Sequence, residues 1–65
     1  MKITVNGELR EITAETSVVV LLQQLRLLPK NVAVELNKRL LRSDRYDTVL
    51  HAGDSIEIVT FVGGG

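Results

Sequence analysis

The feature that most constrains the fold is one stretch with the apolar spacing of a helix, set between segments with the spacing of strands. Four apolar residues recur at positions i, i+3, i+4 and i+7 and so lie on one side of a helix: Val18, Leu21, Leu22 and Leu25. The β-branched residues at 18–20 favour a strand, but the stripe continues past them. We therefore predict a helix from Ser17 to about Leu27, with the hydroxyl of Thr16 or Ser17 as its cap. Val20 and Leu27 are predicted to face away from the core.

Segments with alternating apolar residues surround this helix and predict strands. The first covers residues 1–5, and the Asn6-Gly7 dipeptide after it is suited to the positive φ angles of a type I′ hairpin turn. The return strand is predicted from about Glu8 to Thr13. Further strands are predicted at 32–36, 39–41 and 55–61, with a polar, irregular segment containing one helical turn at 42–48.

The return strand carries one irregularity. Leu9 and Ile12 are three residues apart, whereas residues on one face of a strand are two apart. A β-bulge between them would bring both side chains to the same face. We therefore predict a bulge in this strand.

The order of these elements predicts the fold. One helix can cover only one face of such a sheet, so the opposite face is expected to meet water. The helical stripe is predicted to pack on six strand residues: Ile3, Val5, Val34, Leu36, Ile56 and Ile58. This arrangement is the ubiquitin-like β-grasp, an α+β fold with a mixed five-element sheet and one main helix on one face. We assign residues 1–62 to this domain and residues 63–65 to a flexible glycine tail.

The composition argues against several classes of function. The chain has no cysteine, which excludes a disulfide framework, a thiolate metal site and a thiol nucleophile. Eight basic and eight acidic residues give a formal net charge of zero, which does not favour nucleic acid as a partner. No stretch has the length of a membrane span or the pattern of a signal peptide. We therefore predict a cytoplasmic protein that binds neither nucleic acid nor a membrane.

The basic residues are unevenly distributed. Between Arg26 and Arg45 there are six bases and only two acids, Glu35 and Asp44. Such a cluster is typical of a solvated face, and the alternative is a docking patch for an acidic partner. Both interpretations stay open for its densest part, Lys38 to Arg45.

No internal residue forms a recognisable site. His51 is the only histidine and has no partner at a catalytic spacing, so we predict a loop residue. Asp44, Asp47 and Asp54 lack the dense alternation of oxygen ligands found in calcium loops. No helix or lysine follows the final glycines, as a phosphate-binding loop would require. We predict no catalytic residue, no metal site and no bound cofactor.

The C-terminal segment is the part that can take part in chemistry. Gly63, Gly64 and Gly65 lack Cβ atoms and can form a thin thread that enters a narrow cleft in a partner. The tip is an unhindered carboxylate suited to activation as an acyl-adenylate. A frayed terminus and a glycine linker are the alternatives. We predict the terminal carboxylate as the reactive group, with Gly63 and Gly64 as the thread that carries it.

A docking surface is predicted beside this thread. Val59 and Phe61 share one face of the last strand, opposite the core face, and Val62 follows them. A partner has to hold the domain near its reactive end to place the tail accurately. We predict that Val59, Phe61 and Val62 dock a partner; the alternative is that Phe61 folds back and fills the edge of the core.

The whole chain resembles the ThiS family, the sulfur carriers of thiamine thiazole biosynthesis. The resemblance is carried by Met1-Lys2-Ile3-Thr4-Val5-Asn6-Gly7, Thr16-Ser17-Val18 with Leu21-Leu22, Val34-Glu35-Leu36-Asn37, Ala52-Gly53-Asp54-Ser55-Ile56-Glu57-Ile58-Val59 and Phe61-Val62-Gly63-Gly64-Gly65. It implies that an E1-like adenylyltransferase (ThiF type) adenylates Gly65 with ATP. It further implies that a cysteine desulfurase relay supplies sulfur, and that a thiazole synthase (ThiG type) accepts it from the resulting thiocarboxylate. The chain would then be a cosubstrate and not an enzyme.

Three other functions remain open. A molybdopterin-type sulfur carrier shares the fold and the chemistry, but its usual longer chain and proline-containing approach to the terminal glycines are not found in this sequence. A ubiquitin-like modifier would be conjugated to lysines. A structural β-grasp interaction domain would not need the terminal glycines.

Overall fold

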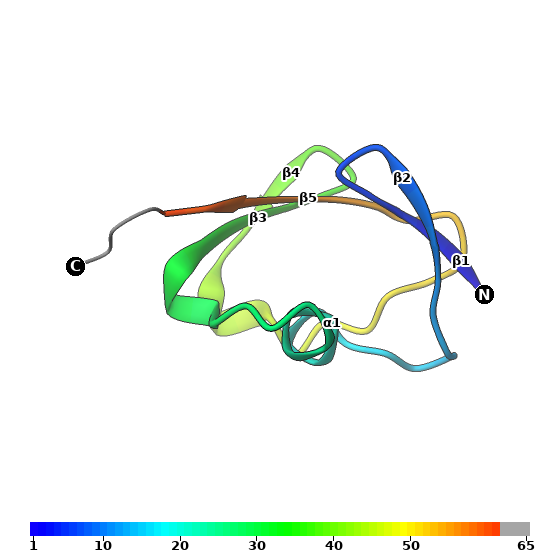
Figure 1. Ribbon diagram of the computed structural model, residues 1–65, viewed down its shortest axis with the longest axis horizontal. Helices are drawn as coiled ribbons and strands as arrows, with labels where there is room; N and C mark the ends of the chain where they lie inside the picture. Colours follow the sequence, from blue (N-terminus) through cyan, green and yellow to red (C-terminus); the bar gives the residue numbers. More distant parts are fainter. Residues whose placement is uncertain (62–65) are drawn as a thin grey trace.

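Five strands form one mixed sheet in the order β2-β1-β5-β3-β4. The computed structural model describes residues 1–61. Its strands are β1 (Lys2–Val5), β2 (Glu8–Glu11), β3 (Val32–Leu36), β4 (Arg39–Leu41) and β5 (Ser55–Thr60). The α-helix is α1 (Val18–Gln24), and two short 3₁₀ turns are η1 (Pro29–Asn31) and η2 (Ser43–Arg45). Figure 1 shows α1 on one side of the sheet, with the other side uncovered by any helix.

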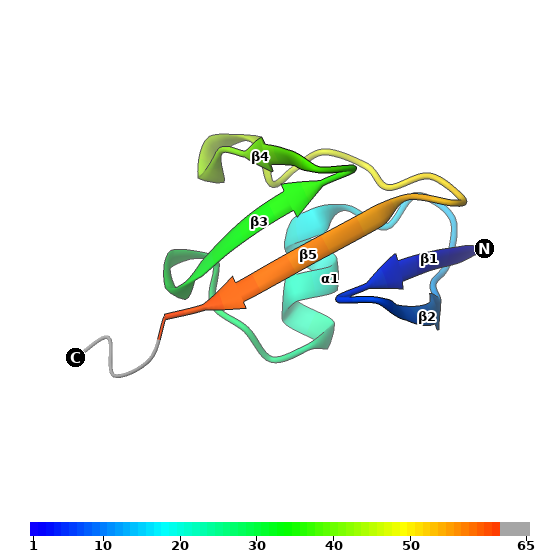
Figure 2. The same ribbon diagram turned by 90° about the horizontal axis from the view of Figure 1, so that it is seen from above.

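The last strand occupies the centre of the sheet. β5 runs parallel to β1, with Val5 opposite Ile56, and antiparallel to β3 along five residue pairs from Val32↔Thr60 to Leu36↔Ile56. In Figure 2 it crosses the whole sheet above α1. The strand order and the single helix on one face are those of the ubiquitin-like β-grasp, which confirms the predicted fold.

The first hairpin forms as predicted, but without a bulge. Asn6 and Gly7 have φ angles of 50° and 82°, and β1 pairs with β2 residue by residue from Val5↔Glu8 to Lys2↔Glu11. Leu9 and Ile12 therefore point to opposite faces: Leu9 is 69% exposed and Ile12 is 6% exposed. The predicted bulge is wrong because only one of these two apolar residues belongs to the core.

The helix is shorter than predicted. The Ser17 Oγ accepts the Val20 N–H at 3.3 Å, which confirms the predicted cap. At the other end Arg26 takes a left-handed φ of 60°, its N–H bonds to the Gln23 carbonyl, and the Leu27 N–H bonds to the Leu22 carbonyl. These two bonds form a Schellman motif, which ends the helix.

This helix end changes the position of Leu27. The residue after the left-handed position turns back toward the helix in such a motif, and Leu27 packs, half-buried, against the core. The prediction that Leu27 faces away from the core is therefore wrong. Val20 is exposed, as predicted.

The core extends beyond the predicted set, in part through the segment between β4 and β5, which contains Tyr46 and Leu50. The buried residues that the prediction did not include are Ile12, Val32, Tyr46 and Leu50. The carbonyls of Thr48 and Tyr46 accept the N–H groups of Val18 and Val19 at 2.9 and 2.8 Å. The segment thus bonds two N–H groups of the first helical turn, which have no partner within the helix. Burial raises the pKa of the Tyr46 phenol.

Two asparagine side chains bond to the backbone of β5. Beyond the end of β1, the Asn6 Oδ1 accepts the Ile58 N–H at 2.7 Å and the Asn6 Nδ2 donates to the Ile58 carbonyl at 3.2 Å. At the start of β5, the Asn37 Oδ1 accepts the Ser55 N–H at 2.9 Å. Both asparagines have a positive φ, near 50°. They serve as turn residues and as hydrogen-bond partners of the central strand.

We expect Asn6→Gly to lower the free energy of unfolding by about 2 kcal/mol, because two hydrogen bonds worth about 1 kcal/mol each are lost. Glycine keeps the positive φ of the turn. The control is Lys38→Gly in the second hairpin turn, where φ is 70°; this change should not lower stability. Urea unfolding of the two variants measures the difference. An Asn6→Gly variant as stable as the wild type would contradict the role given to the side chain.

Candidate functional site

The candidate site is the outer face of β5 and the chain that follows it. Ile58 points into the core and is 7% exposed, whereas Val59 is 60% exposed and Phe61 is 55% exposed. The predicted division of the last strand into a core face and an outer face is therefore present.

Phe61 is held by its backbone and not by its side chain. Its backbone N–H donates to the carbonyl of Asn31, the last residue of η1, at 2.8 Å. The ring is not part of the core cluster, so the alternative in which Phe61 fills the core edge is not the arrangement observed. Val62, Gly63, Gly64 and Gly65 lie outside the described residues, and their roles remain predictions.

Neighbouring strands add apolar side chains to the same face. Ala33 on β3 is paired with Val59, and Leu40 on β4, which is exposed, lies opposite Glu35. Like Val59 and Phe61, both lie on the side of the sheet away from α1. Ala33 and Leu40 were not predicted as part of the site, because their position depends on the pairing of β3 with β4 and β5.

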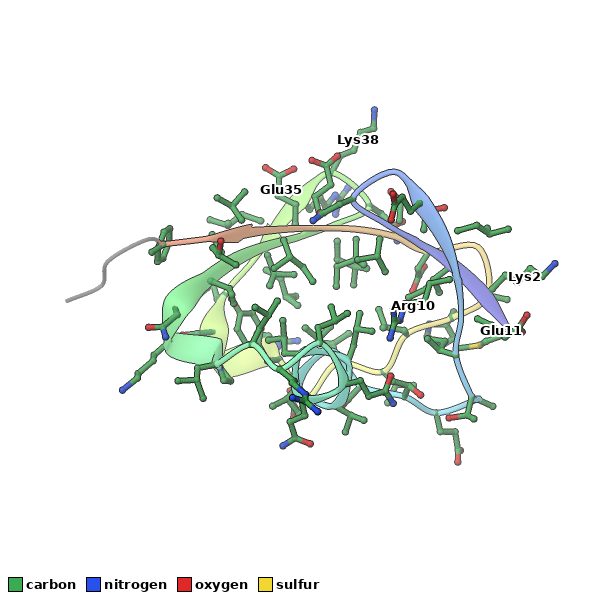
Figure 3. All side chains as sticks on the ribbon, viewed as in Figure 1. Lys2, Arg10, Glu11, Glu35 and Lys38 are labelled. Atoms are coloured by element: carbon green, nitrogen blue, oxygen red, sulfur yellow. The ribbon has the colours of Figure 1, made fainter. Side chains whose placement is uncertain are left out.

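Two carboxylates lie directly opposite each other on this face. Glu35 and Glu57 are paired across β3 and β5, and both are exposed. Figure 3 shows the Glu35 side chain pointing away from the helix. Like charges in opposite positions destabilise a sheet, by up to about 1 kcal/mol. The outer face therefore combines apolar side chains with a local negative charge.

The other candidate residues do not join this site. Arg39 is next to Leu40 on β4 but has the opposite parity, and it pairs with Leu36. Arg42 follows β4 and is exposed, and its Nε lies 3.5 Å from Asp44 Oδ1. His51 is exposed. Its backbone N–H donates to Asp54 Oδ2 at 2.7 Å, so Asp54 stabilises the turn before β5. Within residues 1–61, no three acidic or histidine side chains are grouped as metal binding requires.

None of the helices in residues 1–61 combines the length and apolar character needed to cross a membrane.

The sequence of the chain matches one family. The profile of the ThiS family covers residues 3–65. Two curated relatives are similar over the whole chain: a thiazole synthase of Paramagnetospirillum magneticum, 41% identical, and a thiazole synthase of Magnetococcus marinus, 44% identical. The chain spans only about a fifth of the length of either relative.

Two solved structures have the same fold along the whole chain. The crystal structure of a thiamine biosynthesis protein (ThiS) from Geobacter metallireducens superposes with a TM-score of 0.83 at 33% identity and is covered completely. A solution NMR structure of a thiamine biosynthesis protein from the same organism gives a TM-score of 0.82 at 35% identity, with 88% of that chain covered.

The two faces of β5 should respond differently to truncation. We expect Ile58→Ala to lower the free energy of unfolding by about 2–4 kcal/mol, because it leaves a cavity in the core. The adjacent change Val59→Ala should cost less than about 1 kcal/mol, because that side chain is exposed. Thermal or urea unfolding of both variants provides the comparison. Equal losses would mean that the outer face is covered in solution.

Proposed function

Because the chain belongs to the ThiS family, we propose that it is a sulfur carrier of thiamine biosynthesis and that Gly65 bears the sulfur as a C-terminal thiocarboxylate. The observation that carries this proposal is the match to the ThiS family profile, which extends through residue 65. The similar structures from Geobacter metallireducens, described as thiamine biosynthesis proteins, support the same pathway.

The proposed chemistry has three steps. A carboxylate oxygen of Gly65 first attacks the α-phosphorus of ATP, which releases pyrophosphate and leaves an acyl-adenylate. The persulfide sulfur supplied by a cysteine desulfurase relay then attacks the carbonyl carbon, and AMP leaves with the oxygen that it gained. A thiol cleaves the resulting acyl disulfide, which releases the thiocarboxylate and leaves a disulfide on the donor. Adenylation is needed because a carboxylate oxygen is a poor leaving group. An E1-like adenylyltransferase supplies ATP and the groups that stabilise the developing charge.

The carrier contributes recognition and delivery. In this proposal Val59, Phe61 and Val62 contact the partner, and Gly63 and Gly64 pass through a channel too narrow for side chains. Val59 and Phe61 are exposed on the free face of the sheet, which is compatible with this role. The chain then acts as a protein cosubstrate, and catalysis belongs to its partners.

Thiazole synthase is the proposed acceptor of the sulfur. In the two curated relatives named thiazole synthase, a region similar to this entire chain makes up about a fifth of the polypeptide. A region similar to this carrier and the rest of a thiazole synthase thus occur in one polypeptide. This arrangement favours a thiamine carrier over a molybdopterin-type carrier or a protein modifier.

Deleting Gly65 should abolish adenylation without unfolding the domain. The deletion moves the terminal carboxylate back by roughly 3.3 Å, and a displacement of about 1 Å can already lower a rate on the order of a hundredfold. We expect at least that loss in pyrophosphate release with ATP and the cognate E1-like adenylyltransferase. Thermal unfolding of the shortened chain should match the wild type.

A matched control distinguishes the position of the reactive carboxylate from binding of the folded domain to its partner. Phe61→Ala keeps the length of the tail and the position of its carboxylate, so it should raise the KM for the carrier more than it lowers kcat. Full activity of the Gly65 deletion would refute the assigned position of the reactive group. Absence of adenylation of the full-length chain would refute the proposed function itself.

A further inference from the structure

A groove lies on the helix side of the sheet, away from the proposed docking face. Its volume is about 410 Å³, and it is bounded by the β1–β2 hairpin, the end of β5 and the segment after α1. Its apolar lining comes from Val5, Leu25, Leu27 and Ile58. It forms beside the Schellman motif, where the helix has ended and no longer covers this part of the sheet.

Arg10 gives this apolar groove a positive charge. Arg10 lies opposite Ile3 in the register of β1 and β2 and so points to the helix side. Figure 3 shows its side chain between the hairpin and the helix. Its Nε is fully buried and has no hydrogen-bond acceptor within residues 1–61. A buried donor without an acceptor is costly, and a guanidinium is best satisfied by a carboxylate.

The strand that carries Arg10 also has a free edge. β2 is the outermost strand of the sheet, and Figure 2 shows no other described strand beyond it. Met1 and Ile12 exchange two backbone hydrogen bonds, at 2.7 and 2.8 Å. Because bonded positions alternate in an antiparallel pair, the backbone groups of Leu9 and Glu11 point outward from the edge. A further strand can pair with them.

From these observations we propose that the groove binds an extended acidic segment of a partner protein. The segment pairs with the free edge of β2 at Leu9 and Glu11. Every second side chain of such a segment lies on the helix side, so an aliphatic side chain enters the groove and a carboxylate two residues away reaches Arg10. The free backbone edge beside the groove favours a peptide over a small aliphatic acid, which could use only the apolar lining and Arg10.

This site is separate from the outer face of β5 and does not depend on the role of Gly65. Glu8 is the nearest competitor, since it lines the groove and lies two residues from Arg10 on the same face of β2. No ion pair between Glu8 and Arg10 is formed within the described residues. The guanidinium can therefore donate hydrogen bonds to a carboxylate of a partner protein.

The test uses three probes and solution NMR of the full chain. The first probe is the peptide acetyl-Thr-Ile-Thr-Glu-Thr-amide, whose isoleucine and glutamate share one face when extended. The second has glutamine in place of glutamate, and the third is octanoate. The acidic peptide should shift the amide signals of Leu9 and Glu11 and the methyl signals of Leu25 and Leu27. We expect it to bind about tenfold more tightly than the glutamine peptide, since a charge-assisted hydrogen bond adds about that factor.

Three variants identify the group that binds the carboxylate of the peptide. Arg10→Met keeps an aliphatic side chain and removes the unsatisfied nitrogen, so the domain should unfold at the same or a higher temperature. The same variant should abolish the tenfold preference for the acidic peptide. Arg39→Met, at the opposite edge strand, should leave the preference unchanged. Glu8→Gln should strengthen binding of the acidic peptide, because it removes a like charge next to the incoming carboxylate.

Several results would overturn the proposal. They are the absence of peptide binding, equal affinities of the two peptides, and a preference that persists in Arg10→Met. Octanoate binding without any response of the β2 amides to the acidic peptide would assign the groove to a small molecule instead. None of these results bears on adenylation of Gly65, so the two proposals can fail independently.

Discussion

The position of β5 depends on hydrogen bonds from the two hairpin turns. Its parallel pairing with β1 covers only two residue pairs, Thr4↔Ser55 and Val5↔Ile56. Where β1 ends, the Asn6 side chain continues the bonding with both backbone groups of Ile58. At the start of β5, both the side chain and the backbone of Asn37 bond to the backbone of Ser55. These contacts add to the five-pair ladder with β3 and keep the central strand in register where its pairing with β1 is short.

That register determines which side chains of β5 are buried and which are exposed. Ile56 and Ile58 face α1 and form the core, whereas Val59 and Phe61 stay exposed on the face without a helix. A domain of this size has one helix to cover its sheet, so one face remains available for a partner. The early end of α1 at the left-handed Arg26 leaves a second exposed area, the groove that contains Arg10. The fold thus has two separate exposed surfaces, which are the two proposed docking sites.

Local patterns predicted most of the fold, and long-range contacts account for the errors. Asn6-Gly7 and the alternating residues of β3 and β5 were sufficient to predict the turn and the strands, because these elements are set by neighbouring residues. The bulge was wrong because the prediction placed Leu9 and Ile12 on one face, whereas the regular pairing of β1 with β2 puts Leu9 outside. The buried Tyr46 was missed because its polar segment is ordered by bonds to the start of α1. The side-chain bonds of Asn6 and Asn37 were missed because they join these turns to β5, which is far away in the sequence.

The candidate site also combines features that local patterns predict with features that depend on long-range contacts. The exposure of Val59 and Phe61 followed from the parity of one strand and is confirmed. Ala33 and Leu40 could be assigned to the same face only once the strand order was known. The groove around Arg10 has no sequence signal, because it combines the hairpin, the end of β5 and the chain after α1.

The central claim is that the terminal glycine carries sulfur, and intact-protein mass spectrometry tests it most directly. The full-length chain would be incubated with ATP, its E1-like adenylyltransferase and a sulfide donor, and its C-terminal peptide then analysed. The account predicts a mass increase equal to the difference between one sulfur and one oxygen atom, located at Gly65 and absent without ATP. An unchanged mass, or a sulfur located anywhere else in the chain, would contradict it.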